Sequence, residues 1–162
     1  DIRPARAGES DPIQEIVAQG LLELAGGYLA QRRGYIRESL EGDLADIAGN
    51  YLDQPGSCSW IAGMDGEIKG MIGIQRISDE EAELRRTSVA SDARGQGIGR
   101  KLLDTVENFC RERGYARVCL TTDMLLKPAI SLYRNSGYCQ IAEETCEDVP
   151  GYRFSKELRA QN

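Results

Sequence analysis

The chain has 162 residues, of which 41% are hydrophobic and 28% charged, a composition typical of one soluble globular domain over residues 1–162. Its net charge of −6 provides no basic stripe for phosphates, so we expect no nucleic-acid partner and favour cationic small molecules or basic peptides. There is no histidine, which removes the commonest general base and metal ligand, and we expect no metal site.

Five cysteines, an odd number without Cys-x-x-Cys spacing, indicate free thiols in a reducing compartment. Neither an apolar run of 18 residues nor a signal peptide is visible. We therefore expect a cytoplasmic protein with no membrane partner, and a homodimer is left open as its assembly.

The first predicted elements are a strand and two helices. Ile2–Ala5 is expected at a sheet edge, because it contains a proline. Asp11-Pro12-Ile13-Gln14 predicts a helix start with Asp11 as cap, and Gly26-Gly27 ends that helix. A second helix is predicted from the helical spacing of Leu40, Leu44, Ile47 and Tyr51, while residues 28–37 stay unassigned.

From residue 57 the hydrophobic period becomes that of strands. Cys58–Met64 and Glu67–Ile77 are predicted strands joined by a turn at Asp65-Gly66, and Ala82–Val89 is a third. The helix Ile98–Cys110 follows, with Gly114 as its expected C-terminal cap.

The last elements are a strand at Ala116–Leu120, a helix from Pro128 to Gly137, and strands at Tyr138–Ala142 and Gly151–Ser155. Parallel pairing of Ala116–Leu120 with Ala82–Val89 would complete a right-handed β-α-β crossover. The whole order predicts a mixed sheet with helices on both faces.

The loop over residues 88–101 carries the clearest functional signal. Three closely spaced glycines let the backbone approach a ligand, and the first amides of the next helix have no intrahelical partners. Arg94, Arg100 and Lys101 add charges beside the positive end of the helix dipole. The loop therefore predicts a phosphate site, and a glycine-rich surface turn is the simpler alternative.

Two nucleotide motifs fit this loop poorly. A Walker A sequence is absent, and a dinucleotide fingerprint would need a third glycine where Arg100 stands. Asp123 does lie at about the right distance to bind a ribose, but too few elements follow for a doubly wound sheet.

Arg94-x-x-Gly97-x-Gly99 resembles the acyl-CoA pyrophosphate loop of the GNAT superfamily of N-acetyltransferases. The element order, Leu132-Tyr133 and Gly137-Tyr138 are similar to that superfamily over essentially the whole chain. The resemblance implies an α/β fold of the α+β type: a mixed, mostly antiparallel sheet of six to seven strands, helices on both faces, and splayed fourth and fifth strands.

Residues 83–89, Glu-Leu-Arg-Arg-x-Ser-Val, are also similar to the camello-like branch of the superfamily. Members of that branch usually carry a membrane segment, and none is visible in this sequence.

The resemblance implies acetyl-CoA as co-substrate and an amine-bearing small molecule or peptide as acceptor. The backbone of Thr87, Ser88 and Val89 would hold the pantetheine as an added strand, and an N–H near Val89 would bind the oxyanion. The pyrophosphate would lie against Arg94, Gly95, Gln96, Gly97, Ile98, Gly99 and Arg100.

Two side chains match catalytic positions of the superfamily. Tyr133 corresponds to the tyrosine beside the leaving sulfur; we expect it to hydrogen-bond the thiolate, because a phenol near pKa 10 is a weaker acid than a thiol near 8.5. Glu83 corresponds to the base of several members, with water as the alternative. A core tyrosine and a solvated strand charge are the plain structural alternatives. Leu126 stands where members often carry a CoA-contacting asparagine.

The acceptor itself is suggested only by an acidic segment, residues 143–150, which contains Glu143, Glu144, Glu147, Asp148 and no cation. Such a rim would favour polycationic amines, unless it is only a solvated hairpin. Two other functions remain open: a non-catalytic acyl-CoA sensor, and a dinucleotide-binding oxidoreductase that uses Gly95, Gly97 and Asp123.

Overall fold

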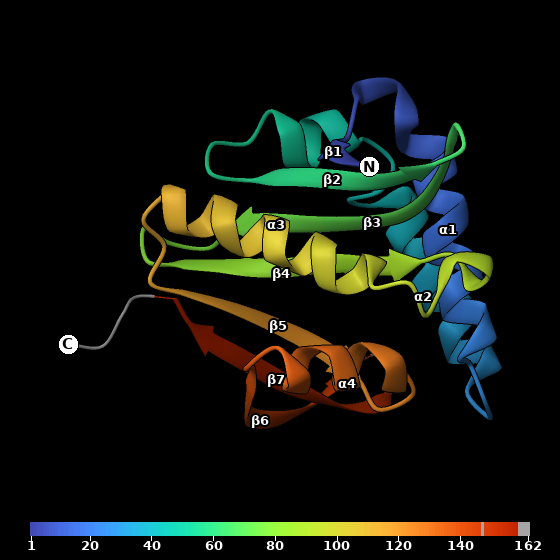
Figure 1. Ribbon diagram of the computed structural model, residues 1–162. Helices are drawn as coiled ribbons and strands as arrows, with labels where there is room; N and C mark the ends of the chain where they lie inside the picture. The colour runs from blue at the N-terminus through green and yellow to red at the C-terminus, as the bar shows by residue number, and fades with distance from the viewer. Residues whose placement is uncertain (147, 159–162) are drawn as a thin grey trace.

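The computed structural model describes residues 1–146 and 148–158, and it confirms the predicted order of strands and helices (Figure 1). The elements are β1 (Ile2–Pro4), α1 (Ser10–Glu23), α2 (Leu29–Glu41), β2 (Cys58–Met64), β3 (Glu67–Arg76), β4 (Glu81–Val89), α3 (Ile98–Glu112), β5 (Arg117–Asp123), α4 (Lys127–Asn135), β6 (Cys139–Cys146) and β7 (Val149–Glu157).

The strands form one seven-stranded sheet in the order β1-β2-β3-β4-β5-β7-β6. β4 and β5 run parallel, as predicted, and the other neighbouring pairs described are antiparallel. The parallel pairing is short: it joins residues 81–83 to residues 117–119 and then stops. Beyond it the two strands diverge, which confirms the splayed pair and opens a gap in the sheet (Figure 1).

Helices cover both faces of this sheet, as expected (Figure 1). One core lies between the sheet and α3 with α4, and includes Leu102, Val106, Ile130 and Tyr133. The other lies beneath α1 and α2, and includes Ile13, Val17 and Ile36. The gap between β4 and β5 therefore lies between two packed layers, each of which contributes side chains to it.

A bulge in β4 changes the direction of its side chains beside the gap. Met71 on β3 pairs with Ser88, but Gly73 pairs with Arg85, so Arg86 and Thr87 together face one residue of β3. Arg86 takes up the extra length with a positive φ of 61°, a left-handed conformation rare for a side chain of this kind. As a result Arg86 contacts α2, whereas Thr87 lies near Tyr133 of α4.

The predicted second helix is misplaced. The structure has α2 at Leu29–Glu41, and residues 48–52 form only a π turn. Leu44, Ile47 and Tyr51 are fully buried as their spacing suggested, but they reach the core from irregular backbone. The unassigned segment is helical although its buried face contains Arg32 and Ser39 with Ile36, a mixture that hides the apolar period.

Other boundaries differ in detail. α1 starts at Ser10 rather than after an Asp11 cap; a 3-10 turn precedes it, in which the Glu9 carboxylate accepts a hydrogen bond from the Arg6 N–H at 2.7 Å. β6 and β7 extend further than predicted, so most of the acidic segment is strand. The turn at Asp65-Gly66 and the Gly114 cap are confirmed by positive φ angles of 52°, 81° and 82°.

Candidate functional site

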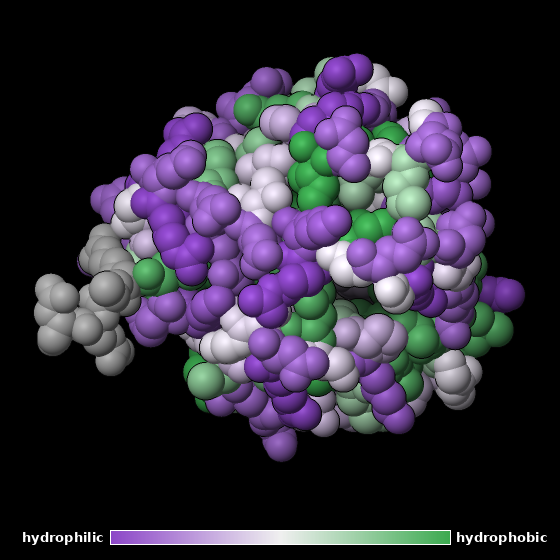
Figure 2. All heavy atoms as spheres, in the orientation of Figure 1, coloured by the Kyte–Doolittle hydropathy of each residue, from purple (hydrophilic) through white to green (hydrophobic). Residues whose placement is uncertain are grey.

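A groove of about 330 Å³ lies beside the glycine loop at the start of α3. The described wall residues come from α1, the end of β4, the loop and α4, and Figure 2 shows this face hollowed between the start of α3 and α4. Of the ten residues predicted to bind the cofactor, nine line the groove: Thr87, Ser88, Val89, Arg94, Gly95, Gly97, Ile98, Gly99 and Arg100. Gln96 belongs to the same loop but is exposed and is not among them.

The loop has the backbone that its glycines suggested. Gly95 and Gly97 have φ angles of 79° and 77°, in the left-handed region that favours glycine, and Gly97 directly precedes α3. The first amides of α3 have no intrahelical acceptors, so the positive end of the helix opens beside the groove.

Across the groove, Arg94 pairs with Glu23 at the end of α1, with 2.9 Å between Nη1 and Oε2. The Nε of Arg94 also donates to the Val89 carbonyl at 3.2 Å. Both charged side chains of the pair are 38% exposed, so this contact is partly hydrated.

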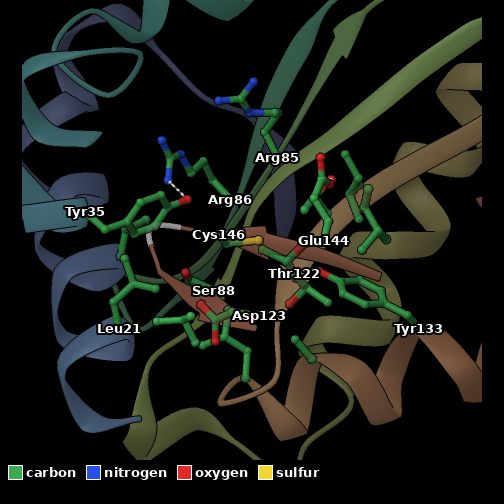
Figure 3. A pocket seen from close by; sticks show the side chains of 18 of the residues that line it. Leu21, Tyr35, Arg85, Arg86, Ser88, Thr122, Asp123, Tyr133, Glu144 and Cys146 are labelled. Carbon is green, nitrogen blue, oxygen red and sulfur yellow. Dashed lines mark hydrogen bonds between the residues drawn. The ribbon is translucent and has the colours of Figure 1, made fainter. Parts of the chain in front are cut away.

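A second cavity, of about 410 Å³, lies on the other side of the gap (Figure 3). It shares Leu21, Thr87, Ser88, Leu126 and Ala129 with the groove, so the two spaces meet in the middle of the splayed strands. Three arginines and three carboxylates line it: Arg32, Arg85, Arg86, Glu83, Asp123 and Glu144. The described wall of this cavity is thus balanced in charge rather than acidic.

Tyr133 and Glu83, the two predicted catalytic residues, both line this cavity. Tyr133 is buried on α4 between Tyr138 and Phe154, with ring centroids 5.8 and 6.4 Å away. Burial raises the pKa of Tyr133 to about 12, and the nearby Thr87 hydroxyl opposes this rise. By hydrogen-bond geometry, Oγ1 of Thr87 has no partner among the described residues.

Glu83 lies on β4 at the point where the parallel pairing ends. Its carboxylate is 3.1 Å from Arg85 and 4.0 Å from Arg153, and its side chain is 24% exposed. The carboxylate therefore lies beside two guanidinium groups on the wall of the cavity.

The predicted oxyanion donor is an N–H near Val89, and the strand geometry fixes the direction of the Val89 amide. The next amide, of Ala90, donates to the Lys69 carbonyl on the β3 side at 2.8 Å. Because successive amides of a strand point to opposite sides, the Val89 N–H points away from β3, toward the gap. Its carbonyl points the same way, in agreement with the bond from Arg94.

A buried ion pair that the sequence did not predict joins α2 to the end of β5. Arg32 donates to both oxygens of Asp123, at 2.7 and 3.0 Å, and the two side chains are 2% and 7% exposed. Asp123 also accepts from the Leu125 N–H at 3.0 Å. The acid that a dinucleotide site would need is therefore bonded to an arginine, and the mixed sheet is not a doubly wound one.

A second network holds the bulge of β4. Arg86 donates to Asp43, with 3.0 Å from Nε to Oδ2, and to the Tyr35 hydroxyl at 2.7 Å, a bond drawn in Figure 3. Tyr51 also donates to Asp43. Burial works against the charged form of Asp43, but the hydrogen bonds and the charge of Arg86 outweigh it and lower the pKa of Asp43.

Of the acidic segment, Glu144 lines the cavity and accepts from the Thr121 hydroxyl at 3.0 Å, whereas Glu143 is exposed on β6 and is not among the lining residues. Asp148 is exposed, and Glu147 lies outside the described residues. Sequence reasoning missed Arg32, Tyr35, Asp43 and Thr122. None left a local signal, and the face of α2 that buries Arg32 mixes polar with apolar side chains.

A glycine loop at a helix start, beside a gap between two parallel strands that splay, defines the GNAT class of fold. The family model described as acetyltransferase (GNAT) family matches residues 26–138, and the chain belongs to this family. Among solved structures, a GNAT-family acetyltransferase from Staphylococcus aureus Mu50 is 23% identical with a TM-score of 0.80, covering 98% of this chain and 99% of its own. The PaiA N-acetyltransferase from Thermoplasma acidophilum, in complex with coenzyme A, has a TM-score of 0.81 at 19% identity, over 97% and 98%. At these identities the likeness concerns the fold.

Two curated relatives are closer in sequence. Rat N-acetyltransferase 8 is 37% identical over 116 residues, which are 68% of this chain and 52% of the relative. The probable N-acetyltransferase camello of Xenopus tropicalis is 37% identical over 114 residues, 69% of this chain and 52% of its own. The chain spans about half the length of the curated relatives that it matches. No helix in the described part of the chain is long and apolar enough to cross a bilayer.

Proposed function

We propose that this chain is an N-acetyltransferase that moves an acetyl group from acetyl-CoA to an amine in a ternary complex. The observation that carries the proposal is the meeting of the groove and the cavity at Thr87 and Ser88, between the splayed strands. The groove suits a cofactor and the cavity an acceptor. Tyr133 lines the cavity, and Leu132, the preceding residue of α4, lines the groove. Membership of the GNAT family and the names of the relatives support the same activity.

Acetyl-CoA would lie along the groove. Its pyrophosphate would accept hydrogen bonds from the loop and α3 amides, with Arg94 and Arg100 as counter-charges. Its pantetheine would extend along residues 87–89, beyond the described pairing of β4 with β5, which ends at Glu83. Leu126 lines the junction of both spaces and offers only apolar contact where many members have an amide.

The reaction would begin when Glu83, directly or through water, takes a proton from the amine, which is almost wholly protonated at neutral pH. The nitrogen then attacks the thioester carbonyl, and the Val89 N–H would stabilise the oxyanion; losing such a donor typically costs about 2.7–4 kcal/mol. Tyr133 would donate a hydrogen bond to the departing sulfur. Its raised pKa makes full proton transfer less favourable than the sequence alone suggested.

The acceptor is an amine-bearing small molecule or peptide. Glu144 supports a cationic one, but the arginines on the cavity wall weaken the expected preference for polycationic amines. We further propose one GNAT domain over residues 1–162 and a cytoplasmic location, the latter supported by the free thiols of Cys58, Cys110, Cys119 and Cys139. A homodimer stays open as the assembly.

The test is release of free thiol from acetyl-CoA with a panel of amines, alongside thermal shifts with acetyl-CoA, CoA and NAD. We expect thiol release with at least one amine, stabilisation by both CoA species, and none by NAD. Gly97→Val should abolish the CoA shift, because a β-branched residue at φ 77° is strained, whereas Tyr133→Phe should keep the shift and lower kcat. Binding without turnover would identify an acyl-CoA sensor, and stabilisation by NAD alone would overturn the proposal.

A further inference from the structure

Two buried hydroxyl groups in the cavity have no hydrogen-bond partner among the described residues. They are Oγ1 of Thr87 on β4 and Oγ1 of Thr122 on β5, and the Thr122 residue is only 6% exposed. A hydroxyl buried without a partner is destabilising, and most buried polar groups find one. Two such groups in one cavity indicate a ligand atom or a water that they are arranged to bind.

Both hydroxyl groups lie on the same side of the gap as Tyr133. Thr87 follows the bulge and lies near the Tyr133 hydroxyl. Thr122 is two residues beyond Leu120, which packs in the same core as Tyr133, so alternation along β5 directs Thr122 to that face. Figure 3 shows the side chains of Thr122 and Tyr133 entering the cavity from β5 and α4.

Tyr133 alone is poorly suited to neutralise a leaving thiolate. With its pKa at about 12, proton transfer to a thiolate near 8.5 is uphill by about 3.5 pKa units. Shared hydrogen bonding needs no such transfer, and each bond to a charged acceptor is roughly twice as strong as a neutral one. Thr87 also lines the cofactor groove, so its hydroxyl lies where the groove and the cavity join.

We propose that the hydroxyls of Thr87 and Thr122 donate hydrogen bonds, together with Tyr133, to the sulfur of CoA as it leaves. The inference rests on the proposed function. The amine nitrogen forms its bond to the acetyl carbon, the carbon–sulfur bond breaks, and the electron pair stays on sulfur. Glu83 or water takes the first proton, which converts the ammonium to the free amine, and releases it to solvent. The second proton, lost by the nitrogen as the amide forms, leaves by the same route, so the three hydroxyls keep their own protons and stabilise the thiolate by hydrogen bonding.

The variants are Thr87→Val and Thr122→Val, which remove a hydroxyl at nearly constant volume, with Thr87→Ser and Thr122→Ser as rescues. Thr105→Val is the matched control, because Thr105 lies partly exposed on α3, away from the cavity lining, and its hydroxyl bonds only to the Lys101 carbonyl at 2.9 Å among the described residues. We expect each cavity Val variant to lower kcat about 10- to 100-fold, the range for a hydrogen bond to a charged group. The KM for acetyl-CoA should change less than twofold, and the Ser variants and the control should stay near wild type.

A second measurement needs no turnover. Ultraviolet titration of the thiol of bound CoA should give a pKa below that of free CoA in the wild type, raised by about one unit in each Val variant. Desulfo-CoA, which lacks the sulfur, should bind wild type and variants alike.

Bound-thiol titrations identical in the wild type and both Val variants would overturn the inference and leave the hydroxyls as binders of water only. Ser variants as impaired as the Val variants would also overturn it, since the methyl packing would then be responsible. If wild type binds CoA but acetylates no amine, the proposed function fails, and the thiol titration still decides the role of the two hydroxyls.

Discussion

Arg86, which has a left-handed backbone in the bulge of β4, allows a stability experiment in which the usual order of glycine and alanine variants should be reversed. In an ordinary strand, glycine is less stable than alanine by about 0.5–1 kcal/mol because it loses more backbone freedom on folding. At φ 61° alanine retains the left-handed strain of about 1–2 kcal/mol, and glycine does not. Arg86→Gly should therefore be more stable than Arg86→Ala.

The magnitude follows from the contacts of the side chain. Both variants lose the ion pair with Asp43, whose partners are 7% and 14% exposed; breaking such a buried pair typically costs about 3–5 kcal/mol. Arg86→Ala should lose this full amount. Arg86→Gly should recover about 1 kcal/mol of it, the strain relief less part of the usual entropic disadvantage of glycine.

Urea denaturation followed by circular dichroism measures the difference, provided that the variants share one m value. Arg85 is the matched control, because it is the preceding residue of the same strand and has no positive φ. At residue 85 the usual order should hold, so Arg85→Ala should be more stable to urea than Arg85→Gly. If Arg86→Ala is at least as stable as Arg86→Gly, the bulge is not strained and the reasoning is wrong.

Two further predictions concern the far side of the cavity. Asp123→Ala should destabilise the fold by about 3–5 kcal/mol, because it leaves Arg32 buried without a counter-charge. Adding Arg32→Met should restore much of the lost stability in a double-mutant cycle, whereas simple additivity of the two changes would show that the pair is not coupled. Gly151→Ala should lower stability by about 1–3 kcal/mol in thermal unfolding, because its Cβ would press on the Thr122 carbonyl and lie 3.0 Å from the Asp123 Cα. Gly34→Ala on α2, where a Cβ meets nothing within 4 Å, should not lower it, and equal effects at both glycines would count against the close approach.

Much of the framework could be predicted because its signals are local. The Asp65-Gly66 turn, the glycine loop and the apolar stripe of α3 each depend on residues a few positions apart. The parallel pairing of β4 with β5 followed from chirality once the helix between them was recognised. The resemblance then brought Tyr133 and Glu83 to one cavity, where the structure places both.

The elements that could not be predicted depend on distant partners. α2 buries Arg32 against the core, so in the sequence its buried face looks polar. The counter-charge of Arg32, Asp123, lies 91 residues later. The bulge at Arg86 is stabilised by Asp43, 43 residues earlier, and no local pattern marks an arginine for a positive φ. Thr122 became notable only when its hydroxyl proved to be buried without a partner among the described residues.

In the proposed complex with acetyl-CoA, the ion pair between Arg94 and Glu23 would make cofactor binding an exchange rather than a simple addition. A diphosphate that reaches Arg94 must displace a carboxylate already bonded to it, so the observed affinity is the difference between two attractions to one guanidinium. Exposed pairs of this kind contribute about 0.2–1 kcal/mol, so the exchange is easily reversed. Salt screens the attraction of Arg94 to Glu23 and its attraction to a diphosphate alike. Arg94 should therefore contribute little to the ionic-strength dependence of binding. The carboxylate that would be displaced belongs to α1, whose Leu21 lines both the groove and the cavity, so the proposed exchange would remove a contact at one end of a helix that borders both spaces.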